Sequence, residues 1–514
     1  MIGVFPRRSA VRLQGSAVLI VGLAVVVALF FGLAIAVVGG IASTLIFVGL
    51  VGLAGVLANF RLGVWLAVAL LPFAATQLMP RQILGVIGLN PLNILLAVTF
   101  CALLFETAFG KRKLVFPVLP WIFVVYLTLI FIGAARGVLH AESAIPTTLP
   151  DGSHEPLTKI KYLLDAVFKP VLILVVAWLA AILSLAGQGQ RLLWAVVLSA
   201  GIYFSLVAGF LLLSGFQFQS LAGSNSRDFL SWMGMHANEV GLLCNMTMAT
   251  LLFAGLGARG GLQRAIFLVA AGLMGVTSVL TFSRGAFVGA LFVAGYFLIS
   301  RRRFGQMLLS LIILAGVAMV LPDAAIERAL TGLGDWGGPA FTAGRMDNIW
   351  LPLLPTVAAS PVIGNGLSSV MWAPANVQGR MLPVGHPHSA YLGVLLDFGL
   401  VGVAIIGAFL VSMWRSFRRA REHARSPLWR GYFEGASVCL LLLLVQGITD
   451  DRFVPTYPQY LLWVAYGLSL ASARRAALQP KPASAVDKNS DESAAALGST
   501  APKPNPAGSS SRRW

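Results

Sequence analysis

Two arginines stand where the polar and apolar parts of this chain meet. Arg284 lies in a tight turn between two apolar segments, and Arg345 opens a predicted helix in a long polar loop. An arginine at the bilayer centre costs about 2.5–3.5 kcal/mol, so an arginine at the membrane edge suggests function. Arginine binds phosphate oxygens through paired N–H donors and keeps its charge. The pair therefore predicts a phosphate site; the alternative for Arg284 is a structural anchor at the interface.

Two histidines precede a later apolar segment. His386 and His388 are separated by Pro387, which stiffens the chain between them. We therefore expect one imidazole to face the site and the other to face water or the loop. We assign His388 to the site because it is closer to the following helix. An unperturbed histidine titrates near neutral pH, which suits a general base. A plain surface histidine is the alternative.

Further candidate substrate-binding residues lie on the same predicted side of the membrane. Arg227, His236 and Asn238 fall in a polar stretch, 214–239, and Tyr391 begins the apolar segment after the two histidines. A zinc site would need more Cys, His or Asp at ligand spacing near those histidines. The sequence has none there and no Asp-x-Asp pair on an outer loop. We therefore expect neither a metal nor another cofactor.

The elements that position these residues are predicted to be membrane helices. The chain is 58% hydrophobic and 11% charged, whereas a soluble domain carries about 25% charged residues. At about 20 apolar residues per spanning helix, the chain predicts an all-α polytopic membrane protein with about 12–14 transmembrane helices. Cys101, Cys244 and Cys439 lie inside apolar runs and are predicted to be small core residues. The fourteen apolar segments are 16–36, 41–58, 62–79, 91–109, 116–135, 161–186, 192–213, 236–257, 262–281, 285–300, 306–321, 391–411, 432–448 and 458–471.

The positive charge predicts the orientation of these helices. The net charge is +18, which in a soluble protein would suggest nucleic acid. With the N-terminus placed in the cytoplasm and the segments alternating, 26 of the 37 basic residues are cytoplasmic and 11 are outside. This distribution follows the positive-inside rule, and anionic lipid is the expected partner of the cytoplasmic charge. We therefore expect an inner-membrane protein with both termini in the cytoplasm, and no nucleic acid.

Three parts of the chain are expected. The transmembrane domain is 1–471, and within it lies one large periplasmic loop, 322–390, of 69 residues with short helices. In this loop the sequence SPVIGNG predicts a helix stop and a turn, because proline and glycine continue a helix poorly. The segment 472–514 is rich in Lys, Pro, Ser and Ala and is predicted to be a disordered cytoplasmic tail.

Several of these motifs together resemble the bacterial O-antigen ligase and O-antigen or exopolysaccharide polymerase superfamily. The resemblance is specific from about 220 to 410 and rests on the motifs, in order, Ser283-Arg284-Gly285-Ala286, Arg345 to Trp350, and His388-Ser389-Ala390-Tyr391-Leu392 with Gly399-Leu400-Val401-Gly402. Gly234-Met235-His236-Ala237-Asn238 is similar to the G-H-x-N element of the polymerase branch, with one extra residue. Ser389 departs from the pattern, which has Asn there, and His386 is an additional histidine.

The resemblance implies a membrane glycosyltransferase without a metal, which inverts the anomeric centre. The donor would be a glycan on undecaprenyl diphosphate, since nucleotide sugars are not present in the periplasm. Arg284 and Arg345 would stabilise the departing diphosphate, and His388 would accept the proton of the acceptor hydroxyl. His386, Arg227, His236, Asn238 and Tyr391 are the expected substrate-binding residues.

Other functions stay open from the sequence. Within the family there are two alternatives. The one we prefer is a polymerase of O-antigen or exopolysaccharide repeat units; the other is a ligase that transfers the glycan to lipid A-core or to a protein. A chain-length regulator is a further expected partner of a polymerase. From another class, a secondary transporter or a flippase of polysaccharide precursors would need ionisable residues inside discontinuous helices or a central cavity. A non-catalytic assembly subunit is the third class.

Overall fold

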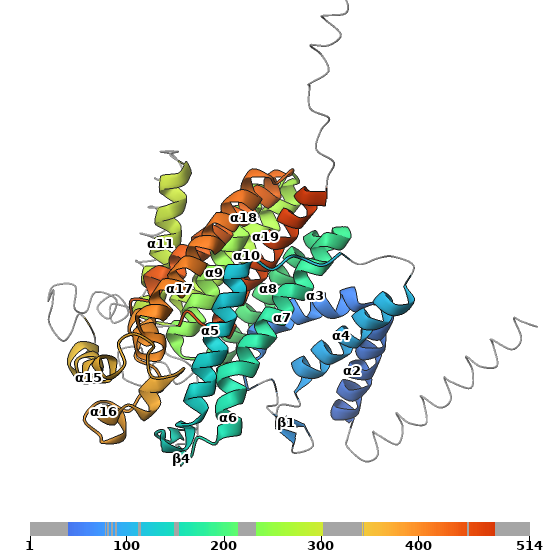
Figure 1. The fold of residues 1–514 in the computed structure, drawn as a ribbon. Coiled ribbons are helices and arrows are strands. Elements are labelled where there is room, and N and C mark those ends of the chain that lie inside the picture. The colour runs from blue at the N-terminus through green and yellow to red at the C-terminus, as the bar shows by residue number, and fades with distance from the viewer. Residues whose placement is uncertain are drawn as a thin grey trace, which may run out of the picture.

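The computed structural model describes residues 40–77, 79, 82–83, 86–87, 90–110, 115–148, 154–213, 233–301, 342, 344–449 and 452–478. These residues form a helical bundle, and the prediction of an all-α polytopic membrane protein is confirmed (Figure 1). Seven helices in the described part of the chain are long and apolar enough to cross a membrane, and one of these is a composite of 54 residues, Lys159–Leu212.

Twelve of the fourteen predicted apolar segments fall on described residues, and each contains a helix. The segments 16–36 and 306–321 lie outside the described residues. The main helices are α2 (Gly40–Ala58), α3 (Phe60–Leu70), α4 (Pro91–Phe109), α5 (Trp121–Val138), α6 (Lys159–Leu163), α7 (Lys169–Leu183), α8 (Gly189–Leu213), α9 (Ala237–Leu256), α10 (Gly261–Val279), α11 (Arg284–Arg301), α15 (Leu351–Ala359), α16 (Pro374–Val377), α17 (Ala390–Glu422), α18 (Pro427–Gln446) and α19 (Tyr460–Leu478).

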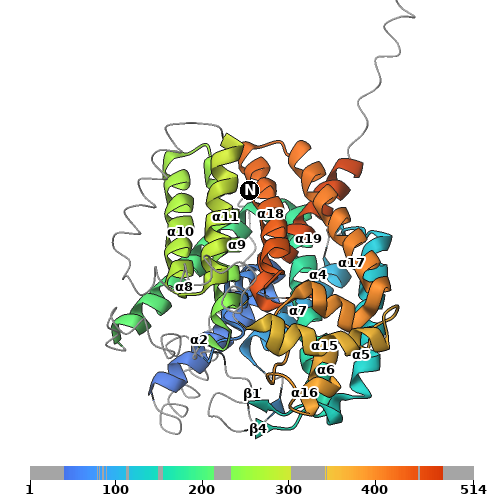
Figure 2. The ribbon, with the colours of Figure 1, turned by 90° about the vertical axis from the view of Figure 1, so that its left-hand side faces the viewer.

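Short elements join these helices. Two antiparallel ladders of two residues per strand pair β1 (Gln82–Ile83) with β2 (Val86–Ile87), and β3 (Thr147–Thr148) with β4 (His154–Glu155). The one-turn helices are η1 (Leu71–Phe73), η2 (Ala141–Ser143), η3 (Leu164–Phe168), η4 (Ser184–Gln188), η7 (Met346–Trp350), η8 (Ser369–Trp372) and η9 (Tyr457–Gln459). In both views of the ribbon, α15, α16 and β4 lie together at one end of the bundle, which we call the loop end (Figures 1 and 2).

The centre of the bundle is built on close contact between α9 and α18. A Cβ atom placed on Gly431 would lie 2.0 Å from the carbonyl oxygen of Phe253, and one on Gly435 would lie 2.8 Å from that of Ala249. Only glycine allows this approach, and small residues four apart are a common way to pack membrane helices. Cys244 and Cys439 are buried in this region, as predicted, whereas Cys101 is exposed on α4.

Helix α17 is broken at Gly399, which the sequence did not indicate. This glycine has φ 61° and ψ −158°, a conformation open in practice only to glycine. The turn that follows α15, residues 361–366, fills the break with four backbone hydrogen bonds. After the break, Leu400 N donates to Pro361 O at 2.9 Å and Val401 N donates to Val362 O at 3.0 Å. Before it, Leu396 O accepts from Asn365 N at 2.8 Å and Asp397 O accepts from Gly366 N at 3.0 Å. The backbone groups released by the break are thus paired within the protein, as a membrane helix requires.

The same turn is also bound to α5. The Arg136 guanidinium donates to Ile363 O and to Gly364 O, both at 2.8 Å. Arg136 lies in the last turn of α5 and fixes the predicted stop and turn after α15. The loop end is therefore a rigid layer joined to two membrane helices.

Two boundaries differ from those expected. Helix α17 continues to Glu422, well past the predicted end at 411. Its last part, from Arg415 to Glu422, is charged rather than apolar and was therefore not included in the apolar segment. Helix α19 continues to Leu478, so the first residues of the expected tail are helical, and Arg475 there donates to Ser184 O. Residues 479–514 and the first part of the large loop, 322–341, lie outside the described residues.

Candidate active site

Four helix ends converge at the loop end of the bundle. They are the starts of α9, α11 and α17 and the end of α18. Ala390 N, at the start of α17, donates to Gly447 O at 2.8 Å, and Ser283 Oγ, just before α11, donates to Asn238 Oδ1 in the first turn of α9. The starts of three helices thus meet, and each contributes the positive end of its dipole. This arrangement favours a negatively charged ligand.

Arg284 is positioned by the two most buried helices. It is the first residue of α11 and is half-buried. The two carbonyl groups that follow it are held from both sides: Gly285 O accepts from Gln446 Nε2 of α18 at 2.6 Å, and Ala286 O accepts from Asn245 Nδ2 of α9 at 2.9 Å. The first turn of α11, which carries Arg284, therefore has a fixed place against α9 and α18.

Arg345 reaches the same place from the large loop. Gly344 has φ 71°, and Arg345 begins the helical run that η7 and α15 continue, as the sequence predicted. The Arg345 guanidinium donates through Nη1 to Thr449 O, in the turn after α18. Gln446, which binds the first turn of α11, lies three residues before Thr449. The carbonyl group next to Arg284 and the guanidinium of Arg345 are therefore both bonded to the end of α18 and the turn that follows it.

The two histidines of the loop lie together. The rings of His386 and His388 have centroids 4.2 Å apart, and His388 N donates to His386 Nδ1 at 3.2 Å. His388 has φ 51°, which places the residue in the left-handed region, and Pro387 O accepts from Trp350 Nε1 at 2.8 Å. The left-handed turn at His388 brings the two rings side by side, and the assignment of His388 to the site stays a prediction.

His236 joins this cluster from α9. Its ring centroid lies 6.3 Å from that of His388. His236 is also the N-cap of α9: Asn238 N donates to its Nδ1 at 3.4 Å, and His236 N donates to Glu239 Oε2 at 2.9 Å. Capping fixes the start of α9 and so fixes this ring near the other two.

Asn238 and Tyr391 have structural contacts of their own. Asn238 accepts from Ser283 Oγ and so ties α9 to the turn that carries Arg284. Tyr391 donates its hydroxyl to Leu444 O at 2.9 Å, and its ring meets that of Phe453 edge-on, with centroids 5.1 Å apart. Tyr391 therefore closes the contact between α17 and α18. Arg227 lies outside the described residues.

A third arginine was missed. Arg452 is exposed and donates through Nη2 to Gly385 O at 3.4 Å, next to His386. The motifs of the sequence do not include it. The predicted topology contained the relevant signal, because it placed Arg452 among the few basic residues on the same side as Arg284. Within the described ranges, no three His, Cys, Asp or Glu side chains are grouped as metal ligands would be.

The fold and the site define a polytopic membrane protein with a cationic, histidine-containing site at one end of its bundle. A family model described as O-Antigen ligase matches residues 269–407. The match confirms the predicted resemblance to the O-antigen ligase and polymerase superfamily, and it supports a membrane enzyme that ligates or polymerises glycans. It spans Arg284, Arg345 and both loop histidines; His236 and Arg452 lie beyond it. A comparison with curated proteins found no match.

Proposed function

We propose that this protein is a glycosyltransferase that uses a glycan on a polyprenyl diphosphate at the periplasmic face of the bacterial inner membrane. The observation that carries the proposal is the convergence of Arg284, Arg345 and His388 at the loop end, where three helices begin. The backbone next to Arg284 and the side chain of Arg345 are bonded to the end of α18 and the turn after it, and His388 lies just before the start of α17.

The reaction that suits this arrangement is a direct displacement. The acceptor hydroxyl oxygen attacks the anomeric carbon of the donor, and the bond from that carbon to the diphosphate oxygen breaks. The diphosphate leaves with the electron pair, and Arg284 and Arg345 stabilise its growing charge. His388 accepts the hydroxyl proton. One displacement inverts the anomeric centre, and the arginines supply the positive charge for which other transferases use a divalent cation.

Two acceptors fit the same chemistry. The partial G-H-x-N element, Gly234 to Asn238, favours a polymerase, in which the acceptor is a second lipid-linked glycan. The description of the matched family favours a ligase, in which the acceptor is lipid A-core or a protein. A polymerase would also associate with a chain-length regulator.

The test is product formation by the purified full-length protein in detergent, with an undecaprenyl-diphosphate oligosaccharide as donor. We expect a ladder of longer glycans from the donor alone, and the ladder should persist in EDTA. A single transferred glycan that appears only when lipid A-core is added would show a ligase. Transport of the intact donor across proteoliposomes without any glycosidic bond formation would overturn the proposal in favour of a flippase.

The proposed side of the membrane has its own test. The 26-to-11 distribution of basic residues places 322–390 in the periplasm and 415–430 in the cytoplasm. Reporter fusions within 344–389 should therefore be active only as periplasmic reporters, and fusions at 415–430 only as cytoplasmic ones. If the reporters showed the opposite orientation, the site would lie on the cytoplasmic side, away from the proposed periplasmic donor.

A further inference from the structure

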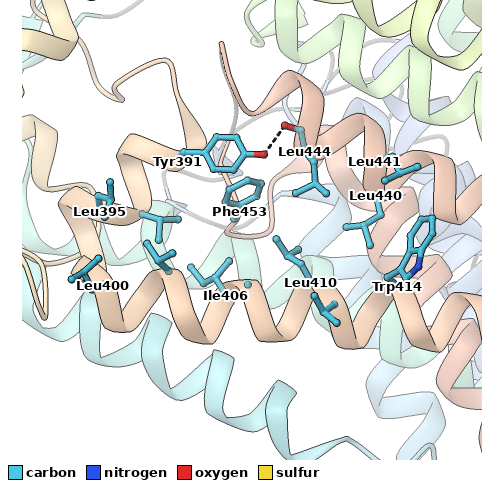
Figure 3. A pocket seen from close by; sticks show the side chains of 14 residues that line it. Tyr391, Leu395, Leu400, Ile406, Leu410, Trp414, Leu440, Leu441, Leu444 and Phe453 are labelled. Atoms are coloured by element: carbon cyan, nitrogen blue, oxygen red, sulfur yellow. Dashed lines mark hydrogen bonds between the residues drawn. The ribbon is translucent and has the colours of Figure 1, made fainter. Parts of the chain in front are cut away.

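An apolar groove runs along the outside of the bundle between α17 and α18 (Figure 3). Its volume is about 600 Å³. On α17 it follows one helical face, formed by Leu400, Val403, Gly407, Leu410 and Trp414. With a rise of 1.5 Å per residue, this face is about 20 Å long, which is a large part of the roughly 30 Å hydrocarbon layer of a bilayer.

The groove is open toward the surroundings of the protein. Leu400 is 59% exposed and Val403 is 44% exposed, although both lie on a membrane helix. A Cβ atom placed on Gly407 would have no heavy atom within 4 Å. The α18 wall is also aliphatic, with Leu440 and Leu444 facing α17. Such a surface binds hydrocarbon chains and offers nothing to a sugar or a phosphate.

One end of the groove meets the candidate active site. Tyr391 and Phe453 line that end, and their rings contact each other. Tyr391 comes three residues after His388, and Phe453 follows Arg452. The hydroxyl of Tyr391 is bonded to Leu444 O, so only its ring faces the groove. Two residues that line the groove are therefore close in sequence to the imidazole of His388 and the guanidinium of Arg452.

A ligand that fits both parts has an anionic head and a single long apolar chain. A phospholipid has an anionic head too, but it carries two chains side by side, whereas this groove is one channel between two helices. Its phosphate also offers one anionic centre, whereas two arginines are attached to the turn at the end of α18. A polyprenyl diphosphate has one chain and two phosphates.

We propose that the groove between α17 and α18 binds the isoprenoid chain of the lipid-linked donor and guides its diphosphate to the arginine and histidine cluster. This inference rests on the proposed function, since it names the place where the donor of that reaction is held.

Gly407 gives a direct test. The Cβ atom of Gly407→Phe would have no heavy atom within 4 Å, so the backbone accepts the side chain and its ring can occupy the groove. Gly272→Phe on α10 is the matched control, because a Cβ there also has no heavy atom within 4 Å. The isoprenoid chain moves from the bilayer into the groove, so it gains packing contacts but no transfer from water, and losing these contacts should weaken donor binding only modestly. We expect Gly407→Phe to raise KM for a long-chain donor by about three- to tenfold with kcat unchanged. A donor with a short, two-isoprene chain should show no difference between Gly407→Phe, Gly272→Phe and wild type.

A binding measurement separates this inference from the proposed reaction. Undecaprenyl diphosphate with a photoreactive group in its chain should label α17 between 400 and 414 and α18 between 440 and 444 in the wild-type protein. Gly407→Phe should reduce this labelling, and excess phosphatidylglycerol should not. If the labelling lies elsewhere, or if phosphatidylglycerol displaces the labelled lipid equally well, the groove is not the binding site of the isoprenoid chain, even in an active enzyme. Correct labelling in a protein that forms no glycosidic bond leaves the groove standing and overturns the proposed reaction.

Discussion

Helices α9 and α18 differ sharply from α17 in how they are packed, and the candidate site uses both kinds. In the apolar window of α9, 78% of the residues are buried inside the protein, and in that of α18, 72% are; the value for α17 is 39%. The buried helices hold Arg284 in place through Asn245 and Gln446. The exposed helix carries the apolar groove.

This difference suggests a division of labour between charge and lipid. A guanidinium that must stabilise a transition state needs fixed neighbours, because preorganised donors do not have to reorganise during the reaction. A lipid chain needs an open route from the bilayer and only weak, extended contact. Changes on the buried side should therefore lower kcat, and changes on the exposed side should raise KM for the long-chain donor alone.

The largest effect is expected at the two arginines. Arg284→Ala and Arg345→Ala should each reduce kcat by more than about 10³, since the loss of one preorganised donor alone costs about 10²–10³. Lysine should restore little of the activity, because it cannot form two parallel bonds to a diphosphate. The measurement is product formation from the lipid-linked donor, with expression and thermal stability checked for each variant.

Arg380→Ala is the matched control, because Arg380 is an exposed arginine of the same loop. It should behave as wild type. Full activity in a protein carrying both Arg284→Lys and Arg345→Lys would show that charge without geometry is sufficient. Activity that disappears with a chelator and returns with Mg²⁺ would contradict metal-independent catalysis.

The second effect concerns the histidines, where the structure sharpens the prediction. His388→Ala should cost about 10²–10⁴ in rate, the usual effect of removing a positioned general base, and His386→Ala should cost much less. His388→Asn is the better variant, because asparagine tolerates the left-handed backbone at this position, φ 51°. It should fold normally and be as inactive as His388→Ala.

His386→Asn should be close to wild type, because an asparagine side chain also accepts from the backbone N–H two residues later and so keeps the contact to His388 N. His423→Ala, at an exposed position at the far end of α17, controls for the loss of an imidazole. An inactive His386→Asn with an active His388→Asn would reverse the assignment of the base. Two active variants would exclude histidine from that role.

Hydropathy and charge predicted the membrane helices well, because a lipid environment imposes a long apolar run on each of them. The helical start at Arg345 and the turn after α15 were also predictable, since glycine and proline act locally. The break at Gly399 was not. Glycine inside an apolar run is compatible with a continuous helix, and the turn that fills the break comes from residues 361–366, more than thirty positions earlier.

The site was predictable only where its residues belonged to motifs. Arg452 lacked a motif, and its contact with Gly385 joins residues far apart in the sequence. Gln446 and Asn245 lie inside apolar helices and looked like isolated polar residues, because their partners are backbone carbonyls of α11. The two histidines stood in a motif, but their relative placement depends on a single left-handed residue, His388, which the sequence does not reveal.

A smaller effect is expected at Gln446. Gln446→Leu removes the donor to Gly285 O but keeps an apolar side chain of similar size, so stability should change little. The first turn of α11 would lose its support from α18, and we expect kcat to fall about tenfold with KM nearly unchanged. Ser437→Ala is the control, because Ser437 is buried on the same helix and donates only to its own helix, at Phe433 O. Equal losses in both variants would mean that Gln446 has no positioning role.

The smallest effect is expected at Arg136, which joins the loop layer to α5. Arg136→Met removes two hydrogen bonds, to Ile363 O and Gly364 O, while the apolar stem of the side chain is kept. Four backbone hydrogen bonds still hold the turn in the break of α17. We therefore expect the catalytic groups to be displaced only slightly and kcat to fall only about two- to fivefold.

Hydrogen exchange gives the readout that distinguishes this local loosening from general destabilisation. Amides 363–366 should exchange faster in Arg136→Met, and those of α9 and α18 should be unchanged. Lys159→Met is the control, because its pair with Glu142, at 3.5 Å, is exposed and such pairs contribute little. If Arg136→Met left both exchange and kcat as in wild type, the loop layer would be held by α17 alone, and the rigid connection between α5 and the site would have to be abandoned.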